Sequence, residues 1–235
     1  NMNRVIEKMY QNMPAFLQDI VVSAYGLKLY RERYSGPWKK YYKELLLSQY
    51  FSEDEIQNLQ SRRIKGLLHH SIHHVRYYRD EPGFKGLDME KDGQEFLKEL
   101  PVLTKEVVRT NPSHFISDLF TKNECITLNT SGTTGTPLTV YVNPEARKLN
   151  YAFFERSKNW AGINGFESSI TFAGRTVVSP DQVNPPFWRR NIFFRNTLFS
   201  SYHLSDANLK YYVGMMTKIR PKFIDAYPSS IERVA

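Results

Sequence analysis

The residues best suited to chemistry form a run of glycines and small hydroxyl residues at positions 130–137, with the sequence TSGTTGTP. Glycine lets the backbone turn sharply and approach a ligand closely, and successive backbone N–H groups can form an anion-binding nest. The threonine and serine hydroxyls add hydrogen-bond donors without adding charge. The run therefore predicts a loop that wraps phosphates, made of Thr130, Ser131, Gly132, Thr133, Thr134, Gly135, Thr136 and Pro137. A hairpin loop without a ligand is the alternative that composition alone leaves open.

The spacing of this run differs from that of the two common phosphate-binding loops. A Walker A loop has the pattern GxxxxGK[ST] before a helix, whereas Gly132 and Gly135 are three residues apart and no lysine follows. A dinucleotide fingerprint, GxGxxG at the start of a helix, is also absent. The segment that follows here alternates in the manner of a strand.

Two other places carry candidate functional residues. His203 lies in the segment Tyr-His-Leu-Ser, and Tyr227, Pro228 and Ser229 follow a predicted strand at 223–226. Ligands of α/β proteins bind at the carboxyl ends of strands, so these three residues are candidates for substrate binding. A purely structural role is the alternative for His203 and for this segment.

A histidine-rich helix and a single cysteine are weaker candidates for functional residues. The pairs His69/His73 and His70/His74 are each four residues apart, on one side of a helix. No nearby Asp, Glu or Cys completes a ligand set, so we expect a polar helix face and assign no metal site. Cys125 lies in a predicted strand, and we expect it to be a buried free thiol.

Helices and strands must position these residues, and the chain divides into two parts by pattern. Residues 1–81 are predicted to be an N-terminal helical region, with helices at 14–34, 38–50 and 52–78. Ser52 and Glu55 have the spacing of a capping box, and the expected apolar face of the third helix is Ile56, Leu59, Ile64, Leu67, Leu68, Ile72 and Val75. Residues 82–235 are predicted to be a partial α/β domain. Its strands are expected at 125–128, 138–142, 169–172 and 223–226, and its helices at 105–110, 144–162 and 206–220, with another from Pro228.

The Thr/Gly run resembles the phosphate-binding signature of the adenylate-forming superfamily. The segments LPVLTKEVVRTNP, HHVRYYRD and RPKFIDAYPSSIERVA are similar to the phenylacetate–coenzyme A ligase and CapK-like branch, and PAFLQDIVVSAYGLKLYRERY is closest to the CapK-like group, named for capsular polysaccharide biosynthesis. The resemblance covers nearly the whole chain and the first half of the family's length. It implies the mixed-sheet N-terminal domain of an adenylate-forming enzyme.

The resemblance also implies a reaction. A carboxylate attacks the α-phosphate of ATP to give an acyl-adenylate and pyrophosphate, and a thiol, usually coenzyme A, then takes the acyl group. The loop would hold the β- and γ-phosphates while Mg²⁺ neutralises charge. His203 lies near where the superfamily often has an aromatic residue or histidine beside the acyl substrate, and residues 227–229 are similar to the substrate-side segment.

Two departures from the family pattern matter. Many members have lysine directly after the proline of the loop, but this chain has Leu138 and then Thr139. The family's later motifs, including the ribose-binding aspartate and the catalytic lysine, do not occur in the chain, which ends inside a helical pattern with no glycine C-cap. We therefore expect a piece of a longer protein that is inactive by itself.

Composition excludes several other classes. The chain has 235 residues, 41% hydrophobic and 24% charged, which is typical of a globular protein and excludes a disordered chain. The single cysteine excludes an internal disulfide and indicates a reducing compartment, so we expect a cytoplasmic protein. No apolar stretch is long enough for a membrane span. The sequence leaves the oligomeric state and the acyl substrate open.

The charge of +8 supports a rival hypothesis. Residues 1–79 hold 13 basic and 7 acidic residues, so most of the excess lies there. A basic nucleic-acid-binding module is one alternative, although the basic residues form no long run and no nucleic-acid motif occurs. A catalytically inactive scaffold of the same fold is the other. We expect a nucleotide and a carboxylic acid as partners, and no nucleic acid.

Overall fold

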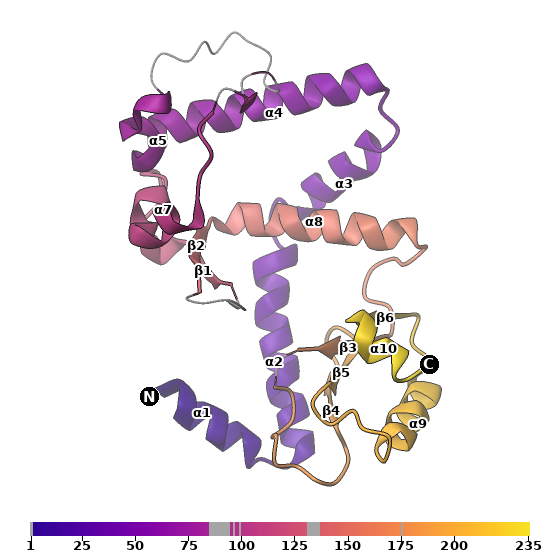
Figure 1. Ribbon diagram of the computed structural model, residues 1–235. Coiled ribbons are helices and arrows are strands. Elements are labelled where there is room, and N and C mark those ends of the chain that lie inside the picture. The colour runs from indigo at the N-terminus through magenta and orange to yellow at the C-terminus, as the bar shows by residue number, and fades with distance from the viewer. Residues whose placement is uncertain (1, 85–94, 96, 99, 131–136, 175) are drawn as a thin grey trace. The chain divides into compact units, whose positions relative to one another are not determined.

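The computed structural model describes residues 2–84, 95, 97–98, 100–130, 137–174 and 176–235. Its first part is helical, as the sequence predicts (Figure 1). The helices are α1 (Met2–Gln11), α2 (Ala15–Tyr34), α3 (Trp38–Ser48), α4 (Glu53–His74) and α5 (Arg76–Asp80). The rest combines helices with two sheets, so the α/β class is confirmed.

The later elements follow in a mixed order. The short helices are η1 (Pro82–Phe84), α7 (Lys105–Thr110), η2 (Pro112–Phe115) and η3 (Lys122–Glu124). The strands are β1 (Ile126–Asn129), β2 (Thr139–Val142), β3 (Ser169–Ala173), β4 (Trp188–Asn191), β5 (Asn196–Ser200) and β6 (Phe223–Ala226), and the remaining helices are α8 (Pro144–Trp160), α9 (Leu209–Ile219) and α10 (Pro228–Glu232). The sequence analysis did not predict β4 and β5.

Local capping explains where several helices begin. Ser52 and Glu55 form the predicted capping box, in which each side chain bonds to the backbone N–H of the other residue. Thr104 caps α7 by a single bond, in which its hydroxyl oxygen accepts from the N–H of Val107. Both starts are confirmed.

The helix predicted to continue to residue 78 ends earlier. Val75 is extended, with φ of −117°, and forms a β-bridge with Ser117 that separates α4 from α5. The expected apolar face of α4 is only partly buried. Leu68 and Val75 lie in the interior, whereas Leu67 is 65% exposed.

One compact unit consists of residues 1–35 and 154–235. Its four-stranded sheet has the order β4-β5-β3-β6, in which β3 runs parallel to both β5 and β6 and β4 is antiparallel to β5. A buried cluster joins side chains of β3 and β5 to residues from α9 (Leu209–Ile219) and the loops, and most of it is aromatic: Ile170, Phe172, Phe187, Phe199, Leu204 and Tyr212. The cluster supplies the rigid support for the loops that follow the strands.

Helix α2 packs against β4 of this sheet (Figure 1), and polar side chains contribute to the contact. Asp19 accepts hydrogen bonds from the backbone N–H of Arg190, at 2.8 Å, and from its Nε, at 3.0 Å. Gln18 accepts from the buried Arg189. The apolar residues Phe16, Leu17, Ile20, Val21, Tyr25 and Leu27 are exposed instead.

The second compact unit consists of residues 36–153. It contains the hairpin of β1 and β2, the helical pair α3 and α4, and the short helices between them and the hairpin. The expected domain boundary near residue 81 falls inside this unit, and residues 1–81 are shared between both units.

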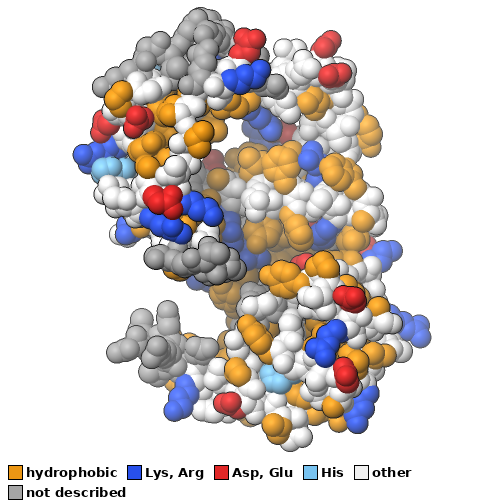
Figure 2. Space-filling model, viewed as in Figure 1, with side chains coloured by type: hydrophobic (Ala, Val, Ile, Leu, Met, Phe, Trp, Pro, Cys, Tyr) orange, Lys and Arg blue, Asp and Glu red, His pale blue; other side chains and the backbone are white. Residues whose placement is uncertain are grey.

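Charged side chains are scattered over the face seen in Figure 2, where Lys and Arg lie among acidic and hydrophobic groups. Among the described helices, none combines the length and the apolar composition that a bilayer-spanning segment needs.

Candidate functional site

The Thr/Gly loop joins two antiparallel strands, as predicted. β1 and β2 pair in the register Ile126↔Val142 to Asn129↔Thr139. At the end of the ladder, Thr130 N–H donates to the Leu138 carbonyl at 3.0 Å, and Leu138 N–H donates to Thr130 Oγ1 at 3.0 Å. These bonds close the base of the loop.

Of the eight predicted phosphate-binding residues, the structure describes Thr130 and Pro137, and both are exposed. Ser131, Gly132, Thr133, Thr134, Gly135 and Thr136 lie outside the described residues. The Thr130 hydroxyl oxygen accepts the Leu138 N–H, and its own hydrogen can still be donated. Thr130 therefore both anchors the loop and has a donor left for a ligand.

Cys125 lies just before the same hairpin. It caps η3 and is half-buried, so the expectation of a buried thiol inside a strand is wrong in both respects. The strand starts one residue later because Cys125 N–H bonds to the Lys122 carbonyl in the 3₁₀ turn.

The other candidate residues gather at the carboxyl ends of the parallel strands. β3, β5 and β6 end at Ala173, Ser200 and Ala226, and the loops after them start from one edge of the sheet. We call residues 174, 200–203 and 227–229 the carboxyl edge. It holds His203 and the segment Tyr227, Pro228 and Ser229; of these, only the segment was predicted to follow the end of a strand.

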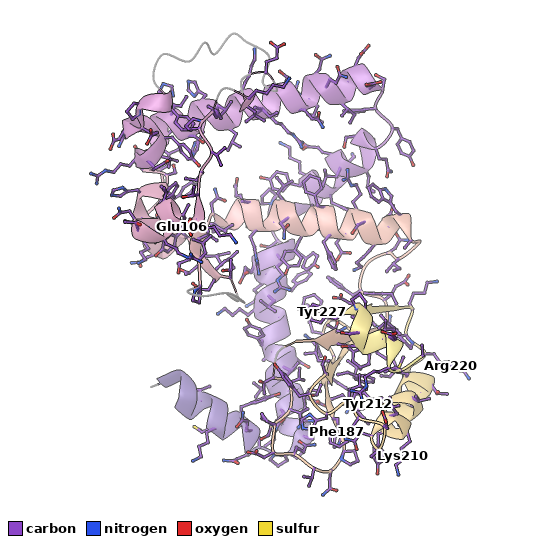
Figure 3. The ribbon with its side chains drawn as sticks, in the orientation of Figure 1. Glu106, Phe187, Lys210, Tyr212, Arg220 and Tyr227 are labelled. Atoms are coloured by element: carbon purple, nitrogen blue, oxygen red, sulfur yellow. The ribbon has the colours of Figure 1, made fainter. Side chains whose placement is uncertain are left out.

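Tyrosine rings cover this edge beside β3. The Tyr202 hydroxyl donates to the Gly174 carbonyl at 3.4 Å. A Cβ at Gly174 would lie 3.1 Å from Cε2 of Tyr227, so the Tyr227 ring contacts the bare backbone there. Both tyrosine side chains remain largely exposed, at 65% and 61%. Tyr227 is labelled in Figure 3, just before α10.

His203 contacts Ser200 through one ring nitrogen and Phe187 through the face of its ring. Its Nδ1 lies 2.7 Å from the hydroxyl of buried Ser200, and the ring stacks on Phe187 with centroids 5.1 Å apart. Its Nε2 is buried and has no hydrogen-bond partner among the described residues. A nitrogen in this setting can donate to a ligand or accept from one, depending on the tautomer that Ser200 selects.

Tyr212 contacts two residues that hold His203, namely Ser200 and Phe187. Its hydroxyl donates to the Ser200 carbonyl at 2.7 Å, and its ring lies 6.1 Å from that of Phe187, which stacks on His203. Phe187 and Tyr212 are labelled in Figure 3. Burial raises the pKa of the Tyr212 phenol above its ordinary value. The phenol therefore stays neutral and keeps donating.

Sequence reasoning missed Gly174, Phe187, Ser200, Tyr202 and Tyr212. A signal existed for two of them, because Tyr202 adjoins His203 and Gly174 lies two residues after a predicted strand. Ser200 is three residues from His203 in sequence. Phe187 contacts His203, and Tyr212 contacts Phe187 and Ser200, only through the fold.

The histidines of α4 take part in ring stacking and in a contact with Asp118. The rings of His69 and His73 stack with centroids 4.1 Å apart. His74 Nδ1 lies 2.9 Å from one oxygen of Asp118, and Arg79 donates to the other at 3.2 Å. The bond with His74, followed by that from Arg79, lowers the pKa of Asp118. No group of three or more potential metal ligands occurs in the part of the chain that the structure describes.

The site and the fold together define an α/β protein with candidate residues after the ends of its parallel strands and on a Thr/Gly hairpin. Comparison with known proteins adds a particular relative. The chain is 26% identical to Protein CapK of Staphylococcus aureus over 231 residues, which are 98% of this chain and 50% of CapK. This similarity supports a CapK-like relationship, and the chain spans about half the length of that relative. No protein-family profile matches the sequence, and no solved structure matches it.

Proposed function

We propose that this chain forms the N-terminal part of an adenylate-forming ligase, which activates a carboxylic acid with ATP and passes the acyl group to a thiol such as coenzyme A. The observation that carries the proposal is the TSGTTGTP loop at the turn of an antiparallel hairpin, closed at its base by Thr130 and Leu138. The similarity to CapK supports it and extends it to capsular polysaccharide biosynthesis. The single cysteine, a free thiol, favours a cytoplasmic setting.

The proposed reaction has two balanced steps. A carboxylate oxygen of the acid attacks the α-phosphorus of ATP, the bond from this phosphorus to the bridging oxygen breaks, and pyrophosphate leaves. The sulfur of the thiol then attacks the acyl carbon, AMP leaves, and the thiol proton passes to solvent. Nucleotidyl transfer of this kind needs positioning and charge stabilisation more than a covalent enzyme residue.

Each group of candidate residues has one role in this proposal. The backbone N–H groups of residues 131–136 and the hydroxyls of residues 130–136 hold the β- and γ-phosphates and stabilise the charge on departing pyrophosphate. His203 Nε2 donates a hydrogen bond to the carboxylate of the acid, in the tautomer whose Nδ1 accepts from the Ser200 hydroxyl. Tyr227, Pro228 and Ser229 line the side of the acid substrate.

Mg²⁺ fits this loop as a partner of the phosphates. Mg²⁺ is commonly held by one or two carboxylates together with substrate phosphates, and the loop itself carries hydroxyls and no carboxylate. In this proposal Mg²⁺ enters with ATP and supplies charge neutralisation, while Thr130 and its neighbours orient the phosphates.

An exchange assay tests the proposal. The full-length gene product is incubated with ATP, labelled pyrophosphate and a panel of carboxylic acids, and labelled ATP is measured. Exchange that depends on one acid is expected, because acyl-adenylate formation is reversible. A folded full-length product that binds ATP yet exchanges no label with any acid would favour an inactive scaffold.

A further inference from the structure

Helices α3 and α4 and the turn between them line an open cavity that the proposed ligase reaction does not use. Its volume is about 300 Å³, which is the lower end of the range for small-molecule sites. The turn between the helices contributes Phe51, and the complete lining is Glu44, Leu47, Ser48, Phe51, Leu59, Arg62 and Arg63. All of these residues belong to the unit of residues 36–153.

The apolar part of the lining is left in contact with water. Leu47 is 57% exposed and Phe51 is 42% exposed, although each adjoins the cavity. Leu59 lies half-buried on the facing helix. An occupant with a hydrocarbon portion would cover these side chains, and burying such surface is favourable in proportion to the area removed from water.

The charged part of the lining favours an anion. Arg62 and Arg63 are successive residues on α4, and neither guanidinium forms an ion pair or hydrogen bond with any described residue. Glu44 supplies one negative charge on the facing helix. The lining therefore carries one positive charge in excess, which matches a monoanion, and guanidinium binds a carboxylate with two parallel hydrogen bonds.

We propose that this cavity binds a carboxylate with a short hydrocarbon chain. The carboxylate lies against Arg62 and Arg63, and the chain packs on Leu47, Phe51 and Leu59. The site is separate in sequence from residues 130–137, 203 and 227–229, and the proposal does not depend on the ligase activity.

Calorimetric titration of the full chain with decanoate, below its micelle concentration and without nucleotide, tests the site. Saturable binding at one site is expected. Shortening the probe to octanoate removes two methylenes, which is expected to weaken binding by up to about 15-fold when both are buried. Decanol, which has no charge, is expected to bind at least about tenfold more weakly than decanoate.

Paired variants separate the site from general surface charge. Arg62→Gln with Arg63→Gln is expected to weaken decanoate binding at least about tenfold. Lys39→Gln with Lys40→Gln removes the same charge from the exposed surface of α3 and is expected to change it less than about twofold. Circular dichroism and melting curves establish that both variants are folded.

Three results would overturn the proposal: no saturable binding of decanoate, equal weakening by the arginine and lysine pairs, or equal affinity for octanoate and decanoate. If the variant with Arg62→Gln and Arg63→Gln does not fold, decanoate binding is measured instead for Ser48→Phe, which fills the cavity without changing charge. Unchanged decanoate affinity in that variant would likewise contradict the site.

Discussion

The two ring nitrogens of His203 have opposite surroundings. Nδ1 meets the Ser200 hydroxyl at 2.7 Å, whereas Nε2 is buried with no partner among the described residues. An unsatisfied buried polar atom costs about 1–3 kcal/mol, so this arrangement opposes folding. Such groups are retained where a ligand satisfies them, which is why we assign His203 to the substrate.

Replacing His203 by Phe separates stability from function. The ring can still stack on Phe187, and the unsatisfied nitrogen disappears while one bond to Ser200 is lost. We expect the free energy of unfolding to change by less than about 1 kcal/mol, because the two effects oppose each other. Acid-dependent exchange by the full-length product should fall by about 10- to 150-fold, the value of one hydrogen bond to a charged group.

Ser200→Ala provides the matched comparison. Ser200 acts only through the orientation of the imidazole, so it is a positioning residue, and a smaller loss of about two- to tenfold is expected. A loss of stability in His203→Phe with unchanged exchange would mean that the histidine is purely structural.

At the scale of elements, α2 shows how a close contact can overrule helix propensity. A Cβ on Gly26 would overlap the Asn191 side chain, whose Oδ1 accepts from Phe194 N–H and is therefore held in place. We expect Gly26→Ala to lower the free energy of unfolding by about 1–3 kcal/mol, although alanine is the better helix former.

Gly66 in α4 is the control for this prediction, since a Cβ there meets nothing within 4 Å. Gly66→Ala should raise the free energy of unfolding by about 0.5–1 kcal/mol. Urea denaturation of both variants measures the two changes. Stabilisation by Gly26→Ala would show that α2 does not pack on β4 as described.

The junction of α4 and α5 should respond to acid. The contacts with His74 and Arg79 lower the pKa of Asp118 in the folded state. Their contribution is therefore complete above the ordinary pKa of aspartate, about 4, and is lost as the pH falls through the lower folded value. Asp118→Asn should melt below the wild type at pH 7, with a difference that shrinks below about pH 4. A difference that is the same at every pH would contradict the assignment.

The sequence predicts most single elements, because their signals are local. The capping box at Ser52 and the helix start at Thr104 depend on residues three positions apart, and both are confirmed. The sequence did not predict β4 because its segment, WRRN, contains two arginines, which are unusual in a buried strand. Arg189 is buried there because it donates hydrogen bonds to Gln18 of α2 and to Gln182 of the preceding loop. The sequence likewise did not predict that α2 packs through Gln18 and Asp19, because their partners Arg189 and Arg190 are far away in sequence.

Which segments of the chain make up one compact unit depends on contacts between residues far apart in sequence. Residues 1–35 join residues 154–235 through pairs far apart in sequence, such as Tyr34 with Glu155 and Asp19 with Arg190. From the carboxyl edge, the sequence predicted His203 and residues 227–229, together with the hairpin loop elsewhere in the chain, but it could not predict which supporting residues surround His203. The phosphate-binding role of the loop stays a prediction.

The net charge of +8 allows a direct test of the nucleic-acid hypothesis. Because the basic residues are scattered, we expect no steep salt dependence of binding to a labelled single-stranded oligonucleotide. Anisotropy titrations between about 50 and 200 mM salt measure it. A loss of affinity of about 10³–10⁵-fold over this range would favour a nucleic-acid-binding protein instead.

The central claim is that residues 130–137 hold phosphates, and the two half-reactions of the full-length product test it most directly. Replacing Thr133 and Thr134 together by Val keeps volume and β-branching and removes two hydroxyl donors. A loss of about 3–6 kcal/mol of transition-state stabilisation should slow adenylation by about 10²–10⁴-fold. Thioester formation from supplied acyl-adenylate should change much less, because pyrophosphate has already left. Equal slowing of both half-reactions would contradict the claim and make the loop a general scaffold.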